Sequence, residues 1–305
     1  MLTAADLAAP GAAPVRQPGG PFAFTEGPVW DNAGALYFSD GFVNRAYRYA
    51  EGACALFREE TRGGNGMALA HDGRLLVCEG GGNRLSAVDT ATLAVETLAD
   101  SYDGRPLNAP NDLALDRAGG VYFTDPYFPA TGQRPIQDAE AVYYLPSGGG
   151  ALTRVWSGDI KPNGVVLTAD ERTLLVADSF GKHVWAVELS TQGAAERAYP
   201  WGALAVPPTA YVAGPGGAPV LLEGYPEATL ADGMALDAEG RLFVAAQQGV
   251  QVLDPDGALL GVLEFPEQPA NCCFGGENLT TLFVTAQHSV YALEMRTTGL
   301  RLPLA

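Results

Sequence analysis

Basic residues are scarce in this sequence. Its 305 residues include 18 lysines and arginines against 35 aspartates and glutamates, which gives a formal net charge of −17. Nucleic acids and anionic membranes are bound by clustered basic side chains, so the composition argues against both classes of partner. The same acidity also suits a soluble surface with few lysines, and by itself it identifies no ligand.

Cysteines and long apolar runs are also few. The four cysteines, Cys54, Cys78, Cys272 and Cys273, show neither metal-ligand spacing nor a disulfide framework, so we expect buried thiols and a reducing compartment. No stretch approaches the roughly 18 apolar residues of a membrane-spanning helix. The N-terminus lacks the basic start and apolar core of a secretory signal. These absences predict a cytoplasmic protein.

Only three histidines are present, His71, His183 and His288, and none occupies a position of the repeat described below. No Ser-His-Asp arrangement can be argued from the sequence. A phosphate-cradling loop between a strand and a helix is likewise missing. The sequence therefore gives no support for serine-type catalysis or nucleotide binding.

A short phrase recurs six times, and each copy opens with a side chain that carries a carboxylate or amide oxygen. The copies are Glu26-Gly-Pro-Val-Trp, Asn65-Gly-Met-Ala-Leu, Asn111-Asp-Leu-Ala-Leu, Asn163-Gly-Val-Val-Leu, Asp232-Gly-Met-Ala-Leu and Asn271-Cys-Cys-Phe-Gly. The intervals between them are 39, 46, 52, 69 and 39 residues. Most lie near the roughly 40 to 50 residues of a four-stranded propeller blade. The longest interval implies an inserted loop.

The composition agrees with many short strands joined by tight turns, because 38 residues are glycine, 22 are proline and only 17% are charged. In the second repeat, the pattern predicts strands near residues 66–70, 75–78, 83–89 and 94–98. The sequence therefore predicts an all-β fold, a six-bladed β-propeller with four-stranded antiparallel blades, as a single domain over residues 1–305.

Two parts of this propeller stay open. Residues 1–20 form an N-terminal extension, and its segment 13–17 is one candidate for the outer strand that completes the last blade. The C-terminal tail, from residue 300, is the other. Residues 191–230 form the insertion, which is either an outer strand with loops or a flap over the channel mouth.

We call the first residues of the six phrases the oxygen ring. Its members are Glu26, Asn65, Asn111, Asn163, Asp232 and Asn271. Taken singly, each is typical of a turn or cap. Turn chemistry does not explain why such residues recur in register, whereas equivalent positions in six blades lie around one axis. A propeller can build a metal site there from distant stretches of sequence.

The ordered blocks resemble the gluconolactonase family that includes senescence marker protein 30, over about residues 24 to 291. The blocks are Glu26-Gly-Pro-Val-Trp, Leu107-Asn-Ala-Pro-Asn-Asp-Leu, Tyr122-Phe-Thr-Asp-Pro, Lys161-Pro-Asn-Gly-Val, Ala231-Asp-Gly-Met and Phe274-Gly-Gly. The resemblance implies a six-bladed propeller with a divalent cation, commonly calcium, in its channel. Position by position it implies Glu26, Asn163 and Asp232 as metal ligands. It places Asn111 beside the metal or its bound substrate.

A physical argument for the same site does not depend on the resemblance. Two carboxylates and two amide oxygens form a hard, all-oxygen set that suits Ca²⁺ or Mg²⁺, with Zn²⁺ and Mn²⁺ as alternatives. Glu26 lies in a segment headed for the interior, where an unpaired carboxylate is costly to bury. A cation on the axis would remove that cost.

Three further residues are candidates for binding substrate. Asn65 and Asn271 are expected to line the channel and to bond substrate or water, with structural hydrogen bonding as the alternative. Arg105 is a candidate for holding a substrate hydroxyl or carboxylate, with a solvated arginine as the alternative. Where many family members have Cys-Glu-His, this chain has Cys78-Glu79-Gly80, which removes an imidazole near the pocket.

The resemblance implies a metal-dependent lactonase that hydrolyses a sugar-type or related small lactone to its hydroxy acid. The cation would polarise the ring carbonyl, and Asp232 is the predicted catalytic base for the attacking water. The alternative is that Asp232 mainly orients hydroxide supplied by the metal. Organophosphate or phosphoester hydrolysis at the same cation, and a non-catalytic binding propeller, are the competing functions. We expect a small-molecule lactone as partner and a monomer or weak homo-oligomer.

Overall fold

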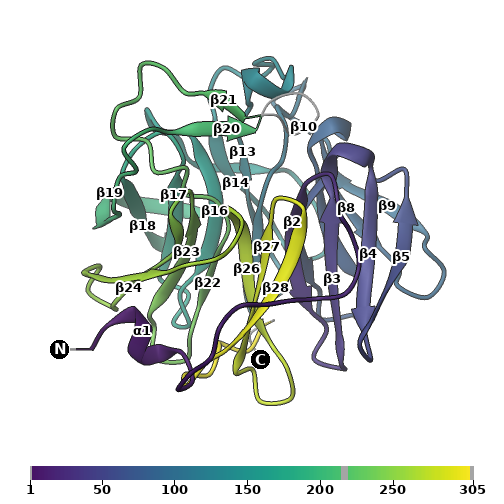
Figure 1. The fold of residues 1–305 in the computed structure, drawn as a ribbon. Helices are drawn as coiled ribbons and strands as arrows, with labels where there is room; N and C mark the ends of the chain where they lie inside the picture. Colours follow the sequence, from purple (N-terminus) through teal and green to yellow (C-terminus); the bar gives the residue numbers. More distant parts are fainter. Residues whose placement is uncertain (1, 214–218, 303–305) are drawn as a thin grey trace.

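The computed structural model describes residues 2–213 and 219–302 and confirms the predicted fold, a six-bladed all-β propeller (Figure 1). Six four-stranded antiparallel sheets form the blades. Within each blade the strands are hydrogen-bonded in chain order from the axis outward, except that an N-terminal strand completes the last blade. The repeated phrases of the sequence therefore correspond to blades.

The first three blades follow one another along the chain. Blade 1 consists of β2 (Thr25–Trp30), β3 (Ala35–Asp40), β4 (Arg45–Ala50) and β5 (Ala53–Glu59). Blade 2 consists of β6 (Gly64–Leu69), β7 (Leu75–Glu79), β8 (Arg84–Val88) and β9 (Val95–Ala99). Blade 3 consists of β12 (Leu113–Leu115), β13 (Val121–Asp125), β14 (Ala141–Leu145) and β15 (Thr153–Trp156). A small hairpin of β10 (Ser101–Tyr102) and β11 (Arg105–Pro106) separates blades 2 and 3.

The other three blades close the circle. Blade 4 consists of β16 (Pro162–Leu167), β17 (Thr173–Asp178), β18 (His183–Thr191) and β19 (Ala194–Ala203). Blade 5 consists of β22 (Met234–Leu236), β23 (Leu242–Ala246), β24 (Gly249–Leu253) and β25 (Leu259–Leu263). Blade 6 consists of β26 (Pro269–Gly275), β27 (Thr281–Ala286), β28 (Ser289–Glu294) and β1 (Val15–Arg16).

Hydrophobic packing between neighbouring blades holds the propeller together. The second strand of a blade is apolar on both faces, and every residue of β7 and of β23 is buried. One cluster, for example, joins Tyr37 of blade 1 to Met67 and Val77 of blade 2. Because each blade is covered on both sides, its middle strands read as nearly continuous apolar runs rather than as alternating ones.

The N-terminal segment completes blade 6. Val15 pairs with Ala292 and Arg16 with Tyr291, so β1 is the outermost strand of that sheet. The C-terminal tail instead crosses the lower end of the propeller in Figure 1, where the N–H of Leu300 donates to the carbonyl of Leu236 at 2.9 Å. Of the two terminal segments that the sequence left as alternatives, the N-terminal one therefore completes blade 6, and the C-terminal one lies across the end of the propeller.

The region 191–230 is divided between two structures. Its first part is β19, the outer strand of blade 4, and a later part is a hairpin of β20 (Tyr211–Ala213) and β21 (Pro219–Leu221). The hairpin lies at the upper end of the molecule in Figure 1, opposite the C-terminus. The outer strand and a structure on the upper face are therefore both present.

Helices are short in this fold. They are α1 (Ala4–Leu7) and the 3₁₀ turns η1 (Gly41–Val43), η2 (Gly80–Gly82) and η3 (Pro129–Thr131). Over residues 2–213 and 219–302, no helix is long and apolar enough to cross a membrane.

Acidic residues at the ends of the second strands fix the loops that enter the blades. Asp125 accepts the N–H groups of Asn108 at 2.8 Å and Ala109 at 2.9 Å. In blade 2 the equivalent acid, Glu79, is fully buried and pairs with Arg58 at 3.0 Å and Arg84 at 2.7 Å. The glutamate of the Cys78-Glu79-Gly80 sequence is therefore engaged in a structural ion-pair network.

Candidate metal centre

The innermost strands bring the oxygen ring to one level of the channel. Glu26 lies in β2, Asn65 in β6, Asn163 in β16 and Asn271 in β26, while Asn111 and Asp232 lie just before β12 and β22. Four of the six, Glu26, Asn111, Asn163 and Asn271, expose 9% or less of their surface. Polar side chains are rarely buried at this density without a partner that satisfies them.

Hydrogen bonds join neighbouring blades at the ring. The N–H of Gly66 in blade 2 donates to the carbonyl of Asn111 at the entry to blade 3, at 2.8 Å. The side-chain amide of Asn271 in blade 6 donates through Nδ2 to Oε2 of Glu26 in blade 1, at 3.1 Å. Side chains 245 positions apart in the sequence are thus held in direct contact.

Hydroxyl groups on second strands add further links between blades. Thr124 of blade 3 donates through Oγ1 to the carbonyl of Asn163 in blade 4, at 2.6 Å. Ser179, directly after the second strand of blade 4, donates through Oγ to the carbonyl of Ala231 beside the ring position of blade 5, at 2.7 Å. These links fix the backbone on which the ring side chains are mounted.

Glycines follow four of the six ring residues because the strands approach closely there. A Cβ atom added to Gly27, Gly66, Gly164 or Gly233 would overlap atoms of Asn65, Asp112, Asp232 or Asn271, respectively. In each case the obstructing residue belongs to the next blade. In these four phrases, the oxygen-bearing residue is therefore followed by a glycine that leaves room for the inner strand of the next blade.

We expect Gly164→Ala to destabilise the propeller by about 3 kcal/mol or more, because the new methyl group would overlap the carbonyl oxygen of Asp232, which is backbone. The matched control is Gly82→Ala, whose Cβ meets the flexible side chain of Arg62 at 3.3 Å and should cost much less. Chemical denaturation of both variants checks this. Equal stability of the two would show that the strands are not tightly apposed at the ring.

Three carboxyl groups at the ring oppose one another's charge. Burial raises the pKa of Glu26 to about 8, and the charge of Asp112 acts in the same direction. Burial likewise raises the pKa of Asp112 to about 7. Burial, then the charges of Glu26 and Asp112, raise the pKa of Asp232 well above its usual range, and the amide of Asn163 acts against this. A bound cation would relieve all three groups at once.

Asp112 is the acidic residue that the sequence reasoning missed. It follows Asn111 and occupies the position at which four of the other five phrases have glycine, as at Gly27 and Gly164. Its side chain is 8% exposed, and its Oδ1 accepts the N–H of Leu113 at 2.9 Å. An aspartate in a glycine column was the available signal. It adds a third acid to the two that the ring itself contains.

Two ring amides have oxygen atoms that no protein group satisfies. Within the described part of the chain, Oδ1 of Asn65 and Oδ1 of Asn163 are buried and accept no hydrogen bond. The orientation of Asn163 is fixed, because Ser179 gives its own proton to Ala231 and can only accept from Asn163 Nδ2, at 3.0 Å. The Asn163 oxygen is therefore left without a donor.

The residues present fit a hard divalent cation. Buried amide oxygens without donors, beside carboxylates that repel one another, are the groups that Ca²⁺ and Mg²⁺ bind. Among the residues that the structure describes, no cluster of three or more His, Cys, Asp and Glu side chains has the arrangement of a metal site. Any cation here would therefore depend on the amides of Asn163 and Asn111 as well as on carboxylates.

Two of the predicted site residues, Asn111 and Arg105, are less directly connected to the cluster of Glu26, Asp112 and Asp232. Asn111 is bonded through its backbone, to Gly66 and to Thr124. Arg105 lies in β11, is exposed, and acts on the pKa of the exposed Asp138, which it helps to lower. Its position is on the hairpin between blades 2 and 3, and its role toward a substrate stays a prediction.

Two proteins that are similar to this chain, one in sequence and one in structure, are named gluconolactonase. A gluconolactonase of Zymomonas mobilis is 32% identical over 90% of this chain and 80% of its own length. A solved gluconolactonase of Xanthomonas campestris is 28% identical, with a TM-score of 0.81 over 96% of this chain and 92% of its own.

A more distant solved structure shares the fold. It is a regucalcin of Agrobacterium tumefaciens, described as a calcium-binding protein, with 20% identity and a TM-score of 0.74 over 93% of this chain and 94% of its own. The family profile described as SMP-30/gluconolactonase/LRE-like region matches residues 24–288. This chain belongs to the SMP-30/gluconolactonase/LRE-like family.

Proposed function

We propose that this protein is a lactonase that requires a divalent cation and opens a small, sugar-type lactone to its hydroxy acid. The observation that carries the proposal is the cluster of Glu26, Asp112 and Asp232 beside amide oxygens without donors; Glu26 and Asp112 are buried and Asp232 is partly buried. A scaffold that only binds other proteins gains nothing from such a cluster, because burying mutually repelling acids is costly. Relatives named gluconolactonase support the choice of substrate class.

Four residues would hold the cation, which we expect to be Ca²⁺, with Mg²⁺, Zn²⁺ and Mn²⁺ as alternatives. They are Glu26, Asn111, Asn163 and Asp232. When bound, the ion would act as a Lewis acid toward the lactone carbonyl. Asn271 supports Glu26 directly by donating Nδ2 to its Oε2 at 3.1 Å, so that one carboxylate oxygen is positioned before any ligand arrives.

Asp232 is the proposed catalytic group. Its carboxylate would accept a proton from the water that adds to the carbonyl carbon, and would return this proton to the departing oxygen as the ring C–O bond breaks. Without a cation, burial and then the charges of Glu26 and Asp112 raise the pKa of Asp232. A bound cation would lower this pKa again, so the alternative role of Asp232 is to orient hydroxide supplied by the metal. Asn65, with its unpaired Oδ1, is suited to accept a hydrogen bond from a substrate hydroxyl.

A substrate panel tests the proposal. We expect the purified protein to hydrolyse glucono-δ-lactone, to lose that activity in chelator, and to regain it on addition of one divalent ion. A phosphotriester tested in parallel should react far more slowly. A faster phosphotriester reaction would make the protein an organophosphate hydrolase, and the absence of both activities with a chelator-insensitive fold would identify a binding propeller.

A further inference from the structure

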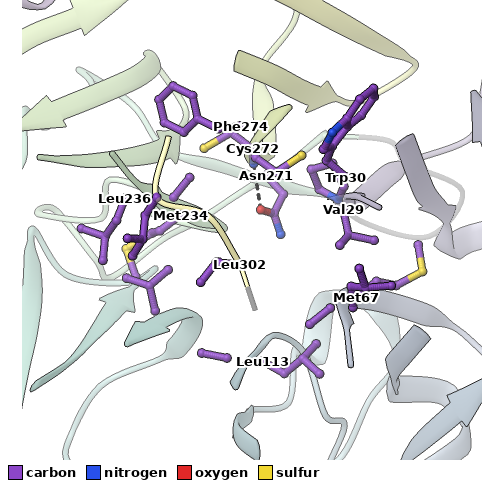
Figure 2. A pocket seen from close by; sticks show the side chains of 18 of the residues that line it. Val29, Trp30, Met67, Leu113, Met234, Leu236, Asn271, Cys272, Phe274 and Leu302 are labelled. Carbon is purple, nitrogen blue, oxygen red and sulfur yellow. Dashed lines mark hydrogen bonds between the residues drawn. The ribbon is translucent and has the colours of Figure 1, made fainter. Parts of the chain in front are cut away.

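A cavity lies directly below the oxygen ring, on the side of the C-terminal tail. It has a volume of about 120 Å³ and is lined by the innermost strands of all six blades and by the C-terminal tail. Figure 2 shows the side chains around it, among them Val29, Met67, Leu113, Met234, Leu236 and Leu302. Asp112 and Asn271 line its upper end, which places it immediately beneath the candidate metal centre.

The walls of this cavity, which we call the lower cavity, are mainly apolar, and the polar groups that line it are already engaged. Asn271 donates through Nδ2 to Glu26 at 3.1 Å and accepts the N–H of Cys272 through Oδ1 at 2.8 Å. Asp112 accepts the N–H of Leu113 at 2.9 Å. Water needs two to four free polar partners to be stable in a cavity, and an anionic ligand would lose its hydration there without compensation.

The outer end of the lower cavity is covered by the tail of the chain. Leu300 and Leu302 both line it. The carbonyl of Leu302 accepts a hydrogen bond from Nδ2 of Asn32 at 2.8 Å, while its side chain is 52% exposed. An apolar cover held by few hydrogen bonds can move aside at modest cost.

Apolar cavities of about 150 Å³ stay dry and take up benzene or xenon, and the lower cavity is of similar size. Two methionines, Met67 and Met234, contribute flexible and polarisable side chains that adapt to different shapes. We propose that the lower cavity is a binding site for one small, uncharged, apolar molecule, a hydrocarbon or simple aromatic of about the size of benzene. The ligand enters from the C-terminal side, opposite the upper-face hairpin of β20 and β21.

The test uses the full-length protein with xenon and benzene as probes. We expect crystals pressurised with xenon to show an ordered atom in the lower cavity, between Leu113 and Met234. In solution, saturating benzene should raise the midpoint temperature of unfolding by about 2 °C, as expected for a ligand that binds only the native state. Neither readout depends on lactone hydrolysis or on a cation, so failure of the proposed function would leave the result unchanged.

A variant with a larger side chain in the lower cavity supplies the control. Leu113→Phe places extra carbon in the lower cavity and should abolish the benzene shift and the xenon site. The same change at an exposed leucine, Leu56→Phe, should leave both intact, because Leu56 is 50% exposed on β5. The proposal is overturned if xenon leaves the wild-type lower cavity empty. An equal benzene shift in the wild-type protein and Leu113→Phe would also overturn it.

Discussion

Asp232→Asn is expected to lower kcat for lactone hydrolysis by about two to four orders of magnitude, the range typical of losing a general base. The variant keeps the size of the side chain but loses the carboxylate that accepts the proton. The fold should persist, because the backbone N–H of Asp232 still donates to the carbonyl of Ala245 at 2.9 Å and the amide oxygen of asparagine can still accept a hydrogen bond from Asn163. Steady-state kinetics together with circular dichroism measure the two effects separately.

The matched control for this variant is Asp256→Asn, in an exposed turn far from the ring in sequence. It removes the same charge and should leave kcat unchanged. Near-normal turnover in Asp232→Asn would take this residue out of the mechanism. Loss of turnover together with loss of the native spectrum would mean that the carboxylate is structural.

The second large effect is expected for Glu26→Gln, which should weaken binding of the divalent cation by at least about 100-fold. Glu26 is 4% exposed, and at a buried site the loss of one ligand charge costs several kcal/mol. Without a cation the variant should be at least as stable as the wild type, since it no longer repels Asp112 and Asp232. With a cation present the order of stability should reverse.

This reversal in the order of stability distinguishes a metal ligand from a residue that has only a structural role. Thermal unfolding of wild type and Glu26→Gln, each in chelator and in Ca²⁺, gives the four values needed. The control is Glu277→Gln at an exposed position, which should respond to Ca²⁺ as the wild type does. If Glu26→Gln is less stable than the wild type in chelator and still gains stability from Ca²⁺, Glu26 is not a ligand.

The blade number was predictable because each blade repeats the same local rules. An oxygen-bearing residue, a short inner strand, a turn and an apolar second strand recur at blade spacing, and local patterns of this kind are visible in one sequence. The way in which the circle of blades closes was not predictable from the sequence. Only two residues, Val15 and Arg16, form the closing strand, and their pairing with β28 depends on tertiary structure.

The ring was predictable as a set, whereas its electrostatics and hydrogen bonding were not. The sequence shows Asp112 at a position where most phrases have glycine, but only the structure shows that its charge acts on Glu26 and Asp232. The orphaned oxygen of Asn163 depends on Ser179, which lies 16 residues further along the chain. Interactions between side chains on different strands leave no periodic mark on the sequence.

The most direct test of the account is a crystal structure of the protein grown with millimolar Ca²⁺. We expect one strong density peak on the propeller axis, in contact with the side-chain oxygens of Glu26, Asn163 and Asp232, with the Asn163 amide in its present orientation. Side chains of these three residues directed away from one another, with no ion among them, would contradict it.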